Sequence, residues 1–212
     1  MKIIKNFVVL EGIDGSGTTT QLNMLETFFL QNRAQQAMPP FYKTYEPTNS
    51  SIGQLIRRAL RKEIALEAET TALLFAADRN EHLYGSGGIE ERCERGELVI
   101  SDRYAPSSLV YQGITCGDEL PLKLNRDFPN PELLLFFDID PLNAQDRIAH
   151  RELREIYEYL DFQIQVRQRY KNLLPLLAEQ GVAVEIIDAS LPPSEVAGAV
   201  WKIIEKLPIF NR

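Results

Sequence analysis

The sequence has few of the features that would place it outside the cell or in a membrane. Only two cysteines occur among 212 residues, Cys93 and Cys116, and they show neither paired nor metal-ligand spacing, which is typical of reduced thiols in a cytosolic protein. No apolar run approaches a membrane span, and residues 7–10 are too short for a signal-peptide core. We therefore expect a cytoplasmic protein with no membrane partner.

An excess of basic residues is also lacking. Lys and Arg number 23 against 30 Asp and Glu, so the formal net charge is −7. Because nucleic-acid backbones need a basic surface, this balance argues against a nucleic-acid partner. A small polyanion stays possible, since a local group of arginines can lie inside an acidic envelope.

Short apolar runs alternate with helical patterns along the chain. This order is typical of right-handed βαβ units around a parallel sheet, and the length suits a single domain over residues 1–212. We predict five strands with helices between them, and irregular stretches at residues 85–88 and 115–130. The predicted strands lie at residues 7–10, 41–45, 98–100, 133–137 and 182–187.

A glycine-rich segment, residues 12–19, follows the first predicted strand and opens a helix. This is the context of a P-loop, in which glycines let backbone N–H groups surround phosphate oxygens at a helix N-terminus. Thr19 stands where a hydroxyl would ligate Mg²⁺, but Thr18 replaces the usual lysine. A glycine-rich turn without a phosphate is the alternative interpretation of the segment.

Three further groups could carry chemistry. Asp102 and Arg103 follow an apolar strand, where a carboxylate could hold Mg²⁺ and a guanidinium could bind phosphate. Phe75 and Arg79 share one helix face and could stack on a base and bond its edge. An arginine-rich stretch follows residue 146. The alternative interpretations of the three groups are, in the same order, a helix-capping pair, a core Phe beside a solvated Arg, and a solvated helix face.

Taken together, these segments resemble thymidylate kinases, a P-loop nucleoside-monophosphate kinase family that phosphorylates dTMP to dTDP. The resemblance covers nearly the whole chain and keeps both order and spacing. It implies the three-layer P-loop NTPase fold, of class α/β, with a central five-stranded parallel sheet flanked by helices. The segments that carry it are residues 10–17, 19–21, 46–47, 52–53, 73–79, 102–104, 107–108, 111–113, 131–138 and 187–190.

The resemblance also implies a role for particular residues. Phe75 would stack on thymine, Arg79 would reach its exocyclic oxygen, and Tyr111 would crowd a ribose 2′-hydroxyl. The full dTMP set is Asp14, Phe75, Arg79, Arg103, Ser107, Ser108, Tyr111 and Gln112. The ATP set is Gly12, Asp14, Gly15, Ser16, Gly17, Thr18, Thr19, Thr20 and Arg147. Mg²⁺ would be organised by Thr19, Asp102 and Glu11. The catalytic set is Arg103, Asp14, Arg151 and Arg154.

In this family the catalytic arginine lies in the P-loop or in a lid, and Gly15 occupies the loop position. The resemblance therefore implies a lid around residues 147–160, and we expect Arg151 or Arg154 to compensate for Thr18. A homodimer is also implied, with residues 73–75 and 109–111 as contributors. Two alternatives stay open: a kinase for another deoxynucleoside monophosphate, and a nucleotide-binding relative with weak or no catalysis because of Thr18.

Overall fold

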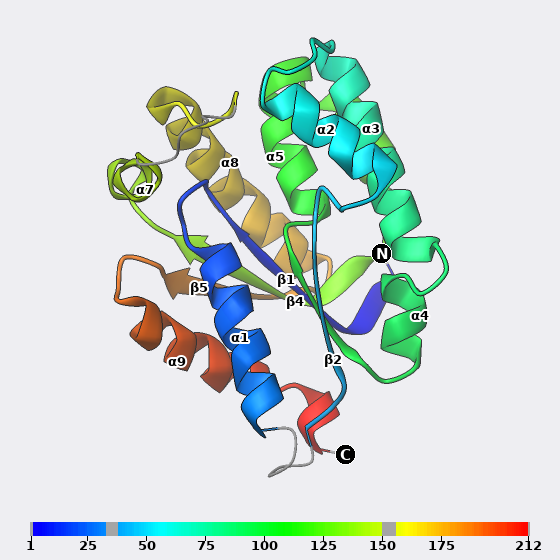
Figure 1. The fold of residues 1–212 in the computed structure, drawn as a ribbon, viewed down its shortest axis with the longest axis vertical. Helices are drawn as coiled ribbons and strands as arrows, with labels where there is room; N and C mark the ends of the chain where they lie inside the picture. The colour runs from blue at the N-terminus through cyan, green and yellow to red at the C-terminus, as the bar shows by residue number, and fades with distance from the viewer. Residues whose placement is uncertain (1, 33–37, 150–155, 212) are drawn as a thin grey trace.

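A five-stranded parallel sheet forms the centre of the protein, in a computed structural model that describes residues 2–32, 38–149 and 156–211. Its strand order is β2-β3-β1-β4-β5, which confirms the predicted sheet (Figure 1). The strands are β1 (Ile3–Gly12), β2 (Phe41–Tyr45), β3 (Leu98–Asp102), β4 (Asn130–Asp138) and β5 (Ala183–Asp188).

Helices pack on both faces of this sheet and complete three layers. In Figure 1, α1 and α9 lie together on one face, while α3, α4, α5 and α8 lie on the other. The α-helices of the described ranges are α1 (Thr18–Asn32), α2 (Ser51–Leu60), α3 (Ala68–Tyr84), α4 (Ile89–Glu94), α5 (Ala105–Cys116), α6 (Glu119–Asn125), α7 (Pro141–Ile148), α8 (Leu160–Glu179) and α9 (Pro193–Ile204). None of them is long and apolar enough to cross a bilayer.

The central strands are buried on both faces, which explains their continuous apolar runs. Along β1, Val8 and Leu10 join the larger core cluster, which includes Leu22 of α1. Phe7 and Val9 join a smaller cluster with residues of α3 and α4. Alternate residues of one strand therefore hold the two helical layers together.

The clearest correction concerns residues 115–130, which we expected to be irregular. Within them α6 forms a helix that packs against α5 and α3. Its sequence shows no helical period, and only Pro121 and Asn125 of it are buried. Tertiary contacts therefore stabilise a helix that local pattern does not indicate.

The P-loop and the ends of β1, β3 and β4 meet at one edge of the sheet. Because all strands run parallel, their carboxyl ends share this edge, where open α/β sheets bind ligands. The segment between β2 and α2 borders the same edge of the sheet. Asp78 of α3 accepts hydrogen bonds from the backbone and hydroxyl of Thr48 and from the hydroxyl of Ser50 (2.6–2.7 Å), and Ser50 in turn caps α2.

Candidate active site

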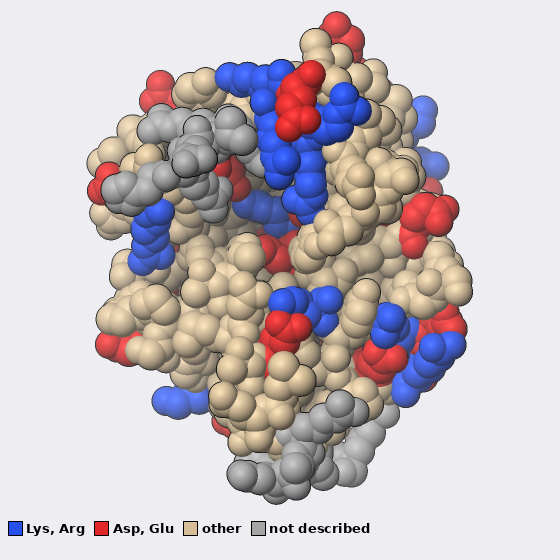
Figure 2. Space-filling model, in the orientation of Figure 1, with Lys and Arg blue, Asp and Glu red and all other residues tan. Residues whose placement is uncertain are grey.

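A cavity of about 930 Å³ opens at this edge of the sheet. Its walls come from the P-loop, the end of β2, α2, α3, the turn after β3, α5 and α7. In Figure 2, Lys and Arg side chains gather where α2 borders the hollow. The lining includes most of the predicted site residues: Asp14, Gly15, Ser16, Gly17, Thr18, Thr19, Thr20, Phe75, Asp102, Arg103, Ser107, Tyr111, Gln112 and Arg147.

Polar atoms without partners gather at this cavity. In the described ranges, four buried side-chain atoms have no hydrogen-bond partner: Ser16 Oγ, Gln21 Oε1, Arg57 Nε and Asp102 Oδ1. All four residues line the cavity. Because an unpartnered buried polar group is costly, this distribution indicates a polar ligand.

The P-loop has the backbone conformation that phosphate binding needs. Gly15 and Gly17 adopt φ values of +85° and +94°, which side chains rarely tolerate. The Ser16 N–H donates to the Ile13 carbonyl (3.1 Å), which closes the turn before α1. A Cβ on Gly15 would lie 2.3 Å from the carbonyl oxygen of Ala144 in α7, so the loop and α7 touch through backbone.

Arg103 and Asp14 form an ion pair in the wall of the cavity. Arg103 Nη2 lies 2.5 Å from Asp14 Oδ1, and Nη1 donates to the Gly12 carbonyl at 3.1 Å. The Tyr111 hydroxyl lies 3.3 Å from the same Asp14 oxygen, and the guanidinium carbon lies 5.0 Å from the Tyr111 ring centroid. The pair leaves the guanidinium at the cavity with further donors for an anion.

The backbone that presents Arg103 is strained. Its φ is +72°, a conformation that costs a bulky residue about 1–3 kcal/mol. Surrounding bonds hold it: its N–H donates to the Leu10 carbonyl (2.9 Å), and the Ser101 hydroxyl donates to its carbonyl (2.7 Å). Strain held in this way is typical of functional sites.

Thr19 and Asp102 form the most suitable place for a divalent cation. The Thr19 hydroxyl lies 2.5 Å from Asp102 Oδ2, while Asp102 Oδ1 is buried without a partner. Such hard oxygen donors suit Mg²⁺. No group of three or more His, Cys, Asp and Glu side chains suited to a metal occurs in the described ranges, so an ion here would need phosphate and water as further ligands.

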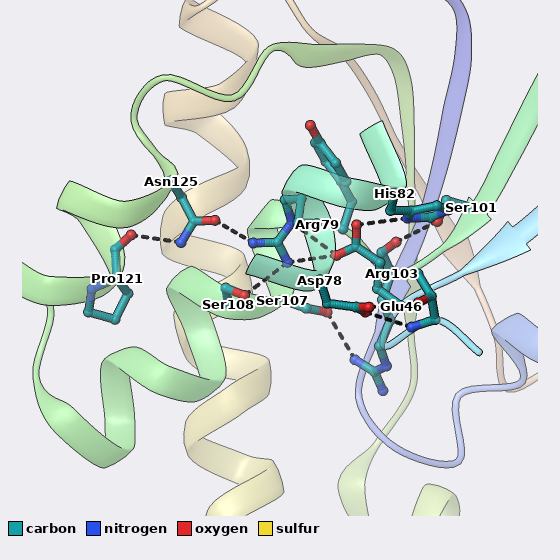
Figure 3. Close-up of polar contacts among 12 residues, drawn as sticks. Glu46, Asp78, Arg79, His82, Ser101, Arg103, Ser107, Ser108, Pro121 and Asn125 are labelled. Atoms are coloured by element: carbon teal, nitrogen blue, oxygen red, sulfur yellow. Dashed lines mark hydrogen bonds and ion pairs between the residues drawn. The ribbon is translucent and has the colours of Figure 1, made fainter. Parts of the chain in front are cut away.

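The structure separates two predicted base contacts from the cavity wall. Arg79 is 1% exposed, and neither it nor Ser108 lines the cavity. Arg79 donates to Glu46 Oε2 through Nε (2.9 Å) and Nη2 (2.7 Å), to the Ser108 hydroxyl, and to Asn125 Oδ1 (Figure 3). The surrounding protein therefore holds Arg79 directly behind the wall.

Glu11 also lies behind the wall, although we expected it to organise Mg²⁺. It is fully buried, and it accepts hydrogen bonds from the Tyr104 and Ser107 N–H groups at Oε1. Its Oε2 accepts from the Ser107 and Tyr170 hydroxyls at 2.6 and 2.7 Å. Both oxygens are occupied by protein donors, so Glu11 has no lone pair directed at the cavity.

Burial raises the pKa of Glu11 to about 7, although Arg103 and the hydroxyl hydrogen bonds favour its charged form. Geometry agrees with this shift. Glu11 Oε2, Ser107 Oγ and Tyr170 Oη form a triangle whose third edge, between the two hydroxyls, is 2.9 Å. Two hydroxyl hydrogens can fill only two of the three edges. When the carboxyl group is protonated it donates to one hydroxyl, which frees a hydroxyl hydrogen for the edge between Ser107 and Tyr170.

Of the remaining predicted residues, some lie within the described ranges and others lie outside them. Gly12 is not among the lining residues, but its carbonyl accepts a hydrogen bond from Arg103, and the Arg147 guanidinium lies 3.5 Å from the Ser190 carbonyl oxygen. Arg151 and Arg154, the predicted lid arginines, lie outside the described residues.

Sequence reasoning missed two residues at this site. Gln163 of α8 donates to Asp14 Oδ2 (2.9 Å) and accepts from the Asp14 N–H (3.0 Å), which fixes the carboxylate. Arg57 of α2 lines the cavity, bonds the Pro47 carbonyl and lies over the Tyr45 ring. Arg57 is one of several arginines on a half-exposed helix, so only the fold distinguishes it.

Comparison with known proteins identifies relatives of this chain. The family model described as thymidylate kinase matches residues 10–200. The chain is 42% identical to a putative thymidylate kinase of Treponema pallidum, covering 89% of this chain and 88% of that protein, and 40% identical to a probable thymidylate kinase of Pyrobaculum aerophilum, covering 97% and 99%. The solved thymidylate kinase of Candida albicans has the same fold, with a TM-score of 0.79 and 24% identity over 97% and 93% of the two chains.

The raised pKa of Glu11 predicts a pH-dependent stability. Between pH 4.5 and about 7 the folded chain keeps a proton that the unfolded chain loses. The stabilisation is therefore complete below pH 4.5 and is lost as the pH rises through 7, by up to about 3 kcal/mol. Glu11→Gln removes the titrating group, so urea unfolding at pH 5.5 and 8.0 should show a smaller loss than the wild type shows.

Glu132→Gln is the matched control, because Glu132 is another buried strand glutamate that accepts a backbone N–H, that of Asn6 at 2.7 Å. Glu132→Gln should keep the part of the stability loss between pH 5.5 and 8.0 that the titration of Glu11 causes. Parallel pH profiles for the wild type and Glu11→Gln would contradict the assignment.

Proposed function

The chain belongs to the thymidylate kinase family, and from this premise we propose how its cavity transfers a phosphoryl group from ATP to dTMP. The enzyme phosphorylates dTMP to dTDP with ATP as the phosphate donor. One observation carries the assignment of the reaction to this cavity: the unpartnered buried polar atoms of the described ranges all belong to its lining, together with Phe75 and Arg103.

The donor phosphates bind in the P-loop. Its glycines direct backbone N–H groups inward, and the N-terminus of α1 adds the positive end of its dipole. The residues from Asp14 to Thr20 line the cavity here together with Arg147, and Gly12 begins the loop that carries them. Thr19 and the free oxygen of Asp102 would hold Mg²⁺, which when bound offsets charge on the phosphates.

The acceptor nucleotide binds against α3 and α5. Phe75 stacks on thymine from the cavity wall, while Ser107, Tyr111 and Gln112 border the sugar and base. Arg79 acts from behind this wall. Its described bonds use four of its five N–H donors, and it is 1% exposed, so a bond from the remaining Nη1 donor to the exocyclic oxygen of the base requires the wall to open when the nucleotide binds.

Two cations hold the acceptor phosphate between them. Arg103 reaches it from the turn after β3, and Arg57 reaches it from α2, where its Nε is buried without a partner. Asp14 limits the motion of Arg103 through the 2.5 Å ion pair, and Gln163 limits that of Asp14. Positioning and charge neutralisation of this kind suffice for in-line phosphoryl transfer.

Thr18 leaves the P-loop without its usual cation, and we assign the compensating charge to Arg151 or Arg154 of the lid. Gly15 supports this assignment, because a side chain there would collide with the Ala144 carbonyl oxygen. An arginine at that loop position is therefore excluded while α7 keeps its place.

The enzyme forms a homodimer in our proposal, and α3 supplies the contact. Leu66, just before α3, and Leu73 are 37% and 51% exposed, and Ala77 lies one turn further on the same exposed face. Residues 109–111 contribute less than we expected, because Val110 and Tyr111 are buried within the chain.

A nucleotide panel tests the function. Purified protein with MgATP should produce ADP fastest with dTMP, when dTMP, dUMP, dCMP, dGMP and dAMP are compared. Arg103→Ala, prepared identically, should lose about 10²–10³ in kcat, since it removes a positioned cation. This variant also controls for kinases carried over from the host. Binding of dTMP without turnover would support a non-catalytic protein, and faster turnover of another nucleotide would show a different base choice.

The compensation at Thr18 is tested by removing the lid arginines singly. Arg151→Ala or Arg154→Ala should lower kcat more than about tenfold, because the transferring group then lacks its cation. Arg126→Ala is the control, since Arg126 is exposed and pairs only with its neighbour Asp127 in the described ranges. If both lid variants stay within tenfold of the wild type and Thr18→Lys gives a large gain, the site has no compensation.

The dimer is tested by placing a charge on α3. Leu73→Glu should shift the protein to monomers in sedimentation velocity at micromolar concentration, because a buried unpaired carboxylate is costly. Leu176→Glu, which changes an equally exposed leucine of α8, should leave the dimer intact. Wild-type protein that sediments as a monomer would exclude the proposal.

A further inference from the structure

Glu11 contacts the turn that presents Arg103 at two points, although it does not itself line the cavity. Its Oε1 lies 3.0 Å from the N–H of Tyr104, the residue directly after Arg103. Its Oε2 lies 2.6 Å from the Ser107 hydroxyl, and that hydroxyl accepts from Arg103 Nη1 at 3.2 Å. One carboxyl group is therefore linked to the backbone directly after Arg103 and, through Ser107, to the Arg103 guanidinium.

The backbone contact does the work of a helix cap. Tyr104 is the N-cap residue of α5 and makes no side-chain cap bond, and Pro106 in the first turn has no N–H. Glu11 Oε1 accepts from the N–H groups of Tyr104 and Ser107, at 3.0 and 3.3 Å, in place of a local cap. The start of α5 is thus fixed to β1 directly after the left-handed residue.

The side-chain contact fixes the position of the Ser107 hydroxyl. Tyr170 of α8 donates to the same carboxyl oxygen at 2.7 Å and lies 2.9 Å from Ser107 Oγ. Glu11 and Tyr170 are both fully buried, and the Tyr170 ring packs against Phe136 of β4 with 5.1 Å between centroids, so the core holds both side chains in place. These contacts hold the Ser107 hydroxyl in place, and Ser107 connects the carboxyl group of Glu11 to the guanidinium of Arg103.

We propose that Glu11 is a positioning residue for phosphoryl transfer, whose carboxyl group holds the left-handed turn at Arg103 and directs its guanidinium toward the transferred group. The proposal rests on the role given above to Arg103. A strained residue returns to ordinary φ values when its supports are removed, and Glu11 supplies the support on the far side of the turn. Small displacements of a positioned group can cost about 10² in rate.

Three variants of Glu11 test it. Glu11→Met keeps the volume but removes both acceptors, and Glu11→Asp keeps the carboxyl group but shortens the reach. Both should lower kcat by about 10² with the KM for MgATP little changed, because the P-loop is not touched. Glu11→Gln keeps an acceptor for the Tyr104 N–H and places N–H donors toward the two hydroxyls. It should retain kcat to within about fivefold.

A double-mutant cycle separates positioning from a general structural role. In an Arg103→Ala background, Glu11→Met and Glu11→Asp should have little further effect on kcat, because no guanidinium remains to be directed. Glu132→Gln is the control: Glu132 accepts from Asn6, which also has a positive φ (+63°) but lies at the other end of the sheet. It should leave kcat unchanged.

The proposal would be overturned if the Glu11 variants lowered kcat by the same factor in the Arg103→Ala background as in the wild type. Wild-type kcat in both Glu11→Met and Glu11→Asp would also overturn it. If Glu11→Met does not fold, Glu11→Asp completes the cycle alone. An Arg103→Ala variant with wild-type kcat would instead contradict the assigned role of Arg103, so the two failures are distinguishable.

Discussion

The left-handed turn at Arg103 is the constraint on which the site depends. It ends β3 and directs the next residues back over β1, so that Arg103 bonds the carbonyl of Leu10 and the guanidinium reaches the P-loop. Without it, α5 would start elsewhere, and Ser107 and Tyr111 would not border the cavity. Parallel pairing of β1 with β3 supplies the register that makes these bonds possible.

The apolar runs predicted the sheet well, because strands buried on both faces must be apolar throughout. The P-loop and the pair Asp102–Arg103 were found because their chemistry is local to the ends of strands. Arg79 illustrates the limit. Its partners Glu46 and Asn125 lie 33 and 46 residues away in sequence, so its enclosure follows only from packing. Glu11 and Gln163 were misjudged or missed for the same reason, since their partners come from other layers.

Charge is distributed unevenly between the surface and the cavity. The chain carries a net charge of −7, yet Arg57, Arg103 and Arg147 line the cavity wall. The carboxylate of Asp14 pairs with Arg103, restricts its motion and reduces its net field. A polyanionic ligand thus meets oriented cations inside an acidic envelope, where orientation contributes more than total charge.

The contact between Gly15 and Ala144 limits how this loop can change through mutation. Position 15 cannot gain a side chain in one step, because its backbone conformation and the α7 carbonyl both oppose it. Position 18 has no such barrier, since it begins an ordinary helix. The backbone geometry therefore allows a longer side chain at position 18 and opposes any side chain at position 15. A cation that this loop lacks can therefore not be supplied from position 15 while α7 keeps its place.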